Sequence, residues 1–269
     1  MRETVEALAG TIGERNRMRP KAYEAAAAFL ADRFRAMGYA PARYRDNIEA
    51  EIRGGDEIVI VGAHYDTVAG SPGADDNASG VAAMLEIARA FAGKAPRETV
   101  RFVAFANEEA PFFGTEEMGS LQYARRCRDR KEKVVAMLSL ETIGYFSDAP
   151  RSQQYPSLLH LIYPPTANFI AFVSNLRSRS LLHRCVREFR AASDVPCERG
   201  ALPEVIPGVS WSDQWSFWQC GYPAIMVTDT ALFRNPHYHS ASDAPETLDY
   251  DRLERVTAGI TAVVRALAR

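Results

Sequence analysis

The chain has 269 residues, of which 47% are hydrophobic and 25% are charged, as is usual for a globular protein. Its length suits one large domain or two small ones. Its 32 lysines and arginines against 34 aspartates and glutamates give a net charge of −2, which excludes the strong positive field of a nucleic-acid-binding protein. No apolar run reaches the roughly 18–20 residues that cross a bilayer, so we expect neither a nucleic acid nor a membrane as partner.

The first twenty residues contain no apolar core of a secretion signal, and we therefore expect a cytoplasmic location, although a trimmed secreted form would look the same. The four cysteines are too few and too scattered for a disulfide scaffold. We expect four free thiols, with Cys185 and Cys197 as the only close pairing. The sequence does not indicate an oligomeric state.

Amphipathic helices and short apolar strands follow one another along the chain. In chain order, the patterns predict a helix over 21–38, a strand over 58–62, a helix over 79–92, strands over 100–106, 134–140, 169–173 and 224–227, and a helix over 251–269. This order is typical of an α/β fold, in which a mostly parallel sheet is covered by helices on both faces. Ligands of such sheets bind at the carboxyl ends of the strands.

Histidine and acidic side chains follow the predicted strands. His64 ends the first apolar run, the pair Glu108-Glu109 follows the next, and Glu141 ends the third. Each has an ordinary alternative: a single histidine is more often an unremarkable polar residue, and an acidic pair usually lies on the surface. Together, however, these residues should meet at one edge of the sheet, where packed carboxylates repel one another without a cation.

Two more polar segments belong to this pattern. Asp75-Asp76 precedes the helix at 79–92, where acidic residues often cap a helix and interact with its dipole. His237 and His239 lie far downstream. Mixed histidine and carboxylate ligands suit zinc, manganese or cobalt. The joint pattern therefore predicts a metal site.

These segments resemble the zinc-dependent exopeptidases of peptidase family M28, from about residue 20 to the end. The matching motifs, in family order, are GAHYDTV at 62–68, SPGADDNASG at 71–80, NEEAPFFGT with MGS at 107–120, LSLETIGYFSD at 138–148, SDQWSFW at 212–218 and NPHYHSASDAPETLDY at 235–250. The resemblance implies an α/β/α sandwich with a mixed, mostly parallel sheet. Because the motifs spread one site from residue 64 to residue 239, we expect one catalytic domain over 1–269.

The resemblance also implies two zinc ions that share one aspartate. In this reading each metal has two ligands of its own, Asp76 bridges both, and positions remain for water and substrate. Asp66 would hydrogen-bond the His64 ring from behind and fix its orientation. The peptide bond after Asp76 is expected to be cis. The implied ligands are His64 and Glu141 for one metal, Glu109 and His239 for the other, and Asp76 for both.

The implied reaction is hydrolysis of a peptide or amino-acyl substrate, as by an aminopeptidase. Two metals would activate a water, and Glu108 would be the general base that passes its proton to the leaving amine. Tyr238 either steadies the tetrahedral oxyanion or is only a packing aromatic residue. His237 is the tempting but wrong choice of ligand, and His160 and His183 match no motif.

Three features depart from the commonest family pattern or stay open. Many relatives have aspartate where Glu141 stands, and the usual Glu-Glu-x-Gly-Leu is replaced by Glu-Glu-Ala-Pro-Phe-Phe, so the substrate pocket is expected to differ more than the chemistry. Most of the aromatic residues near SDQWSFW should pack in the core, while one or two line a pocket. These are Trp211, Trp215, Phe217 and Trp218.

Three other functions compete with this interpretation. A glutaminyl-peptide cyclotransferase has the same fold but uses a single zinc and cyclises an N-terminal glutamine. A non-enzymatic relative would have lost ligands, whereas the base and all five candidate ligands are present here. A two-metal phosphoesterase uses similar ligands, but the order of the motifs does not fit it.

Overall fold

One eight-stranded sheet organises the chain. The computed structural model describes residues 1–269 and orders the strands β1-β2-β4-β3-β5-β8-β6-β7. The four central strands run parallel, while β1, β2 and the β6–β7 pair join through antiparallel contacts. The strands are β1 (Ala42–Tyr44), β2 (Asn47–Ile52), β3 (Gly55–His64), β4 (Glu98–Phe105), β5 (Lys133–Glu141), β6 (Ile170–Ser174), β7 (Cys197–Ala201) and β8 (Ala224–Thr228).

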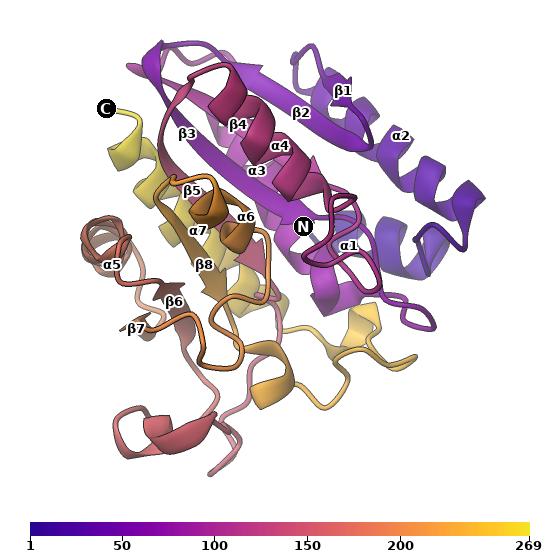
Figure 1. Cartoon of the computed structure of the whole chain (residues 1–269). Coiled ribbons are helices and arrows are strands. Elements are labelled where there is room, and N and C mark those ends of the chain that lie inside the picture. The colour runs from indigo at the N-terminus through magenta and orange to yellow at the C-terminus, as the bar shows by residue number, and fades with distance from the viewer.

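Helices cover both faces of the sheet, so the predicted α/β fold is confirmed (Figure 1). α4 and α6 lie on the near face in this view, and α3 and α7 on the far face. The helices are α1 (Arg2–Val5), α2 (Pro20–Ala36), α3 (Gly80–Phe91), α4 (Gly119–Asp129), α5 (Arg179–Ala192), α6 (Gln214–Gln219) and α7 (Tyr250–Leu267), with short turns at Glu6–Ile12, Ala74–Ser79, Ser157–Leu161, Ala231–Phe233 and Pro245–Thr247. None of the helices combines the length and the apolar character needed to span a membrane.

Every predicted helix and strand is present, within a few residues of its predicted bounds. The four cysteines are free, as expected. The patterns did not reveal the edge strands β1 and β7, the neighbouring strand β2, or the helices α1 and α4 to α6. α4 contains many arginines and β7 reads CERGA, so their apolar patterns are too weak or too short to stand out. α5, by contrast, has a clear apolar stripe that could have been predicted, formed by Leu181, Leu182, Cys185, Val186 and Phe189.

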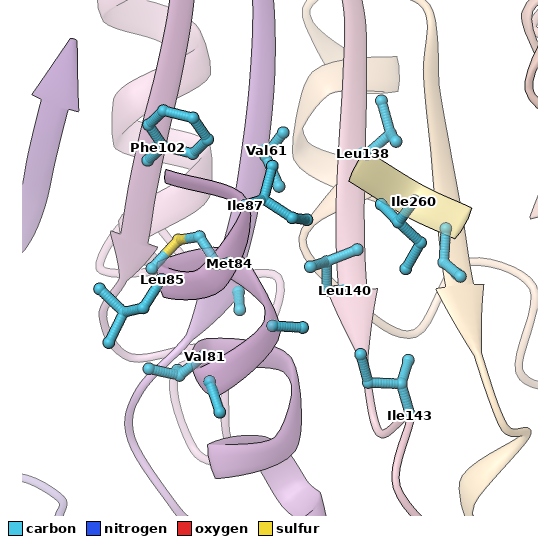
Figure 2. Close-up of a cluster of buried hydrophobic side chains, with 14 of the residues drawn as sticks. Val61, Val81, Met84, Leu85, Ile87, Phe102, Leu138, Leu140, Ile143 and Ile260 are labelled. Carbon is cyan, nitrogen blue, oxygen red and sulfur yellow. The ribbon is translucent and has the colours of Figure 1, made fainter. Parts of the chain in front are cut away.

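The strands divide their side chains between two hydrophobic layers. On β3, Val59 and Val61 enter the large core under α3 and α7, whereas Ile58 and Ile60 enter the smaller core under α4 and α6. This alternation is the period of two that a strand buried on both faces requires. Figure 2 shows Met84 and other α3 side chains against strand residues of the larger core. Packing in the two core layers therefore fixes where the carboxyl end of each strand lies.

α3 approaches the sheet closely where it begins. A Cβ atom on Gly80 would lie 2.3 Å from Oδ1 of Asn77 and 2.5 Å from the carbonyl oxygen of Leu140, so no larger residue fits there. The same turn is tied to the end of β5, because Nδ2 of Asn77 donates to the Leu140 carbonyl at 2.7 Å. This contact holds the segment before α3 over the carboxyl end of β5.

Candidate metal centre

The carboxyl ends of the central strands bring the predicted ligands together. His64 is the last residue of β3 and Glu141 the last of β5, while Glu109 follows β4 by four residues. Asp76 lies in the turn before α3, and His239 lies in the loop after β8. All are buried except His239, whose side chain is 37% exposed, so the centre opens to solvent on the side of His239.

One group of ligand atoms forms around His64. Its Nε2 atom lies 3.2 Å from Oδ1 of Asp76 and 3.3 Å from Oε2 of Glu141. Oε2 of Glu108 is slightly farther from the same nitrogen, at 3.9 Å. His64, Asp76 and Glu141 thus offer one nitrogen and two oxygens to a single point.

A second group forms around His239 and shares Asp76. Nε2 of His239 lies 3.0 Å from Oδ2 of Asp76 and 3.4 Å from Oε1 of Glu109. Each carboxylate oxygen of Asp76 therefore faces a different histidine. The structure places one aspartate between two groups of potential ligands, which is the arrangement a pair of metal ions needs.

The inner atoms of this centre lack ordinary partners. Nε2 of His64 and Oδ1 of Asp76 are buried and make no hydrogen bond. A buried polar atom without a partner is costly, and buried polar atoms in folded proteins are nearly always paired. Imidazole nitrogens and carboxylate oxygens are ligands that zinc accepts. The residues present therefore fit the metal that the resemblance implies.

Asp66 supports the centre through the backbone rather than through the His64 ring. Its carboxylate oxygens accept hydrogen bonds from the backbone N–H groups of Glu108 and Glu109, each at 3.1 Å. Nδ1 of His64 contacts the backbone carbonyl of Asp66 at 3.2 Å, whereas the Asp66 carboxylate is 3.7 Å away, too far for the hydrogen bond that the resemblance implies. The side chain thus fixes the loop that carries both glutamates, and the predicted hydrogen bond from its carboxylate to His64 is wrong.

The segment around Asp76 is held from two sides. The Asp76–Asn77 peptide bond is cis, as the resemblance implies. The carboxylate of Asp243 accepts the backbone N–H groups of Asp75 and Asp76 at 2.9 and 3.1 Å. Asp75 does not cap α3; its carboxylate accepts the N–H of Gly144 at 2.9 Å instead. Asp76 is therefore fixed by its neighbours before any metal binds.

The charges of the centre are strongly coupled. Burial raises the pKa of Glu108 well above its ordinary value and that of Glu109 to about 7. Burial alone would lower the pKa of His239, but Asp76 and Glu109 outweigh it and raise that pKa to about 10. In the same way, Glu141 and Glu108 raise the pKa of His64. When no cation is bound, the histidines are therefore protonated, and their positive charge balances negative charge on the carboxylates.

The remaining histidines lie outside both groups. Nδ1 of His237 contacts Oγ of Ser242 at 2.9 Å, and its ring packs on Tyr145. His160 and His183 are exposed. Tyr238 stacks on the ring of His239, with 3.8 Å between the ring centres, and also lines the cavity described below. Its position beside the second ligand group fits either of the two roles considered for it.

Sequence reasoning missed several residues that support the centre. Oγ of Ser212 donates to Oε2 of Glu141 at 2.7 Å. The carboxylate of Asp213 is buried without a hydrogen bond, and burial raises its pKa to about 7. Both residues open the motif SDQWSFW, for which the resemblance implied no role of a serine or an aspartate. Asp243 was also missed, because a role that depends on backbone contacts leaves no spacing pattern.

An apolar cavity adjoins the centre. It borders Glu141 and Tyr238, has a volume of about 830 Å³ including its open mouth, and is lined mostly by hydrophobic residues from β6, β8 and the loops at 153–163 and 202–211. The segment at 157–161 projects from the body at the lower left of Figure 1. Of the aromatic residues near SDQWSFW, Phe217 and Trp218 are buried in the smaller core and Trp211 lines the cavity.

The Ala-Pro-Phe-Phe loop does not line this cavity. Its Ala110–Pro111 bond is cis, and the ring of Phe113 packs against Trp215 with 5.9 Å between the ring centres. The guanidinium of Arg17 lies 5.5 Å from the centre of the Phe112 ring. Pro111 and Phe112 thus stand at the usual Gly-Leu positions, and the phenylalanines at 112 and 113 each have a cationic or aromatic partner.

The sequence model of peptidase family M28 matches residues 47–264, which include every residue of the two ligand groups. The chain belongs to peptidase family M28. The E. coli protein described as "Uncharacterized protein YfbL" is 38% identical over 216 residues, covering 77% of this chain and 66% of that protein. A probable leucine aminopeptidase of Arthroderma otae is 27% identical over 222 residues, covering 77% of this chain and 52% of the relative. The chain thus spans between about half and two thirds of these relatives.

Solved structures of other proteins share the fold. A zinc aminopeptidase from Bacillus subtilis matches with a TM-score of 0.63 at 22% identity, covering 83% of this chain and 50% of that one. A glutaminyl cyclase from Fimbriiglobus ruber matches with a TM-score of 0.73 at 21% identity, covering 98% of this chain and 93% of that one. At these identities the likeness establishes the fold, and both enzyme types occur on it.

Proposed function

We propose that this chain is a zinc-dependent aminopeptidase, that residues 1–269 form its one catalytic domain, and that its site binds two zinc ions. His64, Asp76 and Glu141 would hold one ion, and Asp76, Glu109 and His239 the other. The observation that carries the proposal is the bridging geometry of Asp76, whose two oxygens lie 3.2 and 3.0 Å from the two histidine nitrogens. Family membership and the unpartnered atoms of His64 and Asp76 support it.

Zinc ions, when bound, lower the pKa of a water molecule and polarise a carbonyl group. Glu108 supplies the base. Its carboxylate is buried beside the first ligand group, and burial raises its pKa, so it is suited to accept a proton from water and return it to the leaving amine. Glu108 itself belongs to neither ligand group, so its carboxylate stays available for this transfer.

Tyr238 would act as a donor to the developing oxyanion. Burial and the surrounding carboxylates raise the pKa of its phenol, so the hydroxyl keeps its proton at neutral pH. The ring is held by stacking on His239. A neutral donor fixed beside a ligand group can stabilise negative charge that forms during the reaction.

The adjoining cavity indicates the substrate side chain. Because most of its lining is hydrophobic, burial of a large apolar side chain there is favourable. The cavity reaches Glu141, so this side chain would belong to a residue whose amide lies at the metals. We propose that the enzyme prefers leucine, phenylalanine or methionine at the N-terminus, in agreement with the leucine aminopeptidases among its relatives.

A glutaminyl-peptide cyclotransferase is the second candidate, supported by the fold shared with the Fimbriiglobus ruber cyclase. Such an enzyme binds one zinc ion and needs only one group of ligands. The complete group around His64, with the unpartnered Nε2 atom, favours the peptidase.

A panel of substrates tests this proposal. We expect the chain to cleave leucyl, phenylalanyl and methionyl anilides faster than glutamyl or lysyl anilides. A chelator should abolish the cleavage and added zinc should restore it. N-acetyl-leucyl anilide, which lacks the free amine, serves as the control and should resist cleavage.

The same panel contains peptides with N-terminal glutamine. Ammonia release and cyclisation of these peptides, without cleavage of any anilide, would show a cyclotransferase. Cleavage of the acetylated control at the same rate as the free substrate would contradict the assignment as an aminopeptidase.

A further inference from the structure

The chain contains a fully buried arginine that pairs with no carboxylate. Arg15 lies between the turn at Glu6–Ile12 and α2, and its side chain is completely inaccessible to solvent. Its Nε donates to the carbonyl of Tyr65 at 2.7 Å, one Nη to the carbonyl of Pro72 at 2.6 Å and the other to that of Gly73 at 2.8 Å. A buried charge is costly unless all its donors are used, so these contacts hold the side chain in place.

The three carbonyls belong to two loops that carry parts of the metal centre. Tyr65 lies between His64 and Asp66, and Pro72-Gly73 precedes Asp76. The backbone of Arg15 joins the first loop as well, because its N–H donates to Oγ1 of Thr67 and its carbonyl accepts the N–H of Thr67, both at 3.1 Å. The guanidinium therefore links both loops to one point.

The loops at 65–67 and 72–73 pack closely against each other. A Cβ atom on Gly73 would lie 2.3 Å from the carbonyl oxygen of Asp76 and 2.4 Å from Cγ2 of Thr67. Gly73 also has a φ of +63°, a conformation that glycine adopts without strain. A change in the position of the Gly73 carbonyl thus reaches Asp76 directly, and a change at Tyr65 reaches His64 and Asp66.

We propose that Arg15 is a positioning residue for the metal centre, which fixes the loops at 65–67 and 72–73 and thereby the places of His64 and Asp76. This inference rests on the proposed function only in that the two groups are taken to bind zinc. Arg15 touches no ligand atom and acts through the backbone. Its charge also faces Asp243, Asp66, Asp76 and Glu109, which attract it.

Replacement by lysine separates positioning from charge. An ammonium group keeps the charge but cannot span three carbonyls as the planar guanidinium does. Arg101 provides the matched control, since it is a second buried arginine but donates to Glu51 and Glu132, away from the metal centre. Zinc affinity of the full chain is measured by competition with a chelator, and thermal unfolding is measured on the zinc-free proteins.

We expect Arg15→Lys and Arg101→Lys both to lower the unfolding temperature. Only Arg15→Lys should weaken zinc binding, by about 10–100-fold, as for other residues that orient metal ligands. Zinc affinity of Arg15→Lys within about twofold of that of Arg101→Lys would overturn the proposal. That result would show that Arg15 contributes only to the stability of the fold, or acts only through its positive charge.

Thr67→Val covers the case in which Arg15→Lys does not fold. It keeps the shape of the side chain and removes the acceptor of the Arg15 N–H. We expect roughly tenfold weaker zinc binding, and unchanged binding would again overturn the proposal. A wild-type chain that binds zinc but cleaves no substrate contradicts the proposed function alone, whereas one that binds no zinc contradicts both.

Discussion

Acidic side chains gather near both ends of the parallel strands, and the two clusters are balanced in opposite ways. Near the amino ends of β3, β4 and β5, Arg101 donates two hydrogen bonds to Glu132, at 2.6 and 3.1 Å, and one to Glu51 at 2.7 Å. Burial would raise the pKa values of both glutamates, but the hydrogen bonds from Arg101 outweigh it and lower them. The cluster at the amino ends is therefore complete as an ion-pair network.

At the carboxyl ends no arginine pairs with Asp76, Glu108, Glu109 or Glu141, and burial instead raises the pKa values of Glu108 and Glu109. Arg15, the one buried guanidinium near them, donates to backbone carbonyls. The fold can thus supply arginines to buried acids and does so at one end. The difference indicates that the acids at the other end are left for a cation from solution.

Substitution of the base should separate catalysis from metal binding most sharply. We expect Glu108→Gln to lower turnover by about 10²–10⁴-fold, because it removes a general base, and to keep the zinc content of the wild type. Steady-state kinetics and metal analysis by atomic absorption measure the two effects. Glu116→Gln, at an exposed glutamate paired with Arg125, is the control and should leave both unchanged. Full activity of Glu108→Gln would remove Glu108 from the mechanism.

A substitution in the cluster at the amino ends of the strands should change only the stability of the protein. Arg101→Met leaves Glu132 without an arginine partner and Glu51 with Arg53 alone, and we expect a loss of about 3 kcal/mol in the free energy of unfolding, at the lower end for a broken buried pair. Zinc binding should not change. Arg125→Met, which breaks an exposed pair with Glu116, should lower the stability much less, because solvent screens exposed ion pairs. Denaturant unfolding measures both, and equal losses would show that the amino-end network contributes little.

Substitution of Ser212 tests how strongly a hydrogen bond to a ligand residue affects zinc affinity. Ser212→Ala removes the hydrogen bond to Oε2 of Glu141, which at 2.7 Å orients that carboxylate. We expect zinc affinity at the first group to fall by about 10–100-fold with little change in stability. Chelator competition measures the affinity. Ser210→Ala, at a serine that donates to the Glu204 carbonyl, is the matched control; an equal effect there would show that the Glu141 contact is not special.

Zinc binding should also depend on pH. In the zinc-free chain the pKa of His239 is raised to about 10, so the ring carries a proton at neutral pH that zinc must displace. Zinc affinity should therefore increase as the pH rises from about 6 to 8, by about tenfold per pH unit for each proton released. Titration calorimetry in two buffers counts the protons. His237→Ala should keep this slope, and a pH-independent affinity would contradict the coupled charges described here.

Much of the fold could be predicted because buried strands leave a clear signal. Val59 and Val61 lie in a continuous apolar run, and α7 places Leu253, Val256 and Ile260 on one face. β2 and β7 gave no such signal, since they are short, partly exposed strands with charged residues. Their places depend on pairing with distant strands, which a local pattern does not contain.

The metal centre also has a part that the sequence predicts and a part that it does not. The five ligand candidates could be predicted because each follows a strand or a motif, and their roles as ligands remain a proposal. The supporting contacts could not, because Asp243 and Arg15 act on the backbone of Asp75, Asp76 and Gly73, and such contacts exist only in the folded chain. Asp66 shows the limit of analogy, since much of its hydrogen bonding goes to the N–H groups of Glu108 and Glu109.

The number of zinc ions per folded chain tests the central claim most directly. Native mass spectrometry at saturating zinc should show two ions on the wild type and on His237→Ala, whose ring lies outside both groups. His239→Ala should lose zinc from the second group. One ion on the wild type would contradict a two-metal centre bridged by Asp76, and loss of that one ion in His239→Ala would favour the single-zinc cyclotransferase.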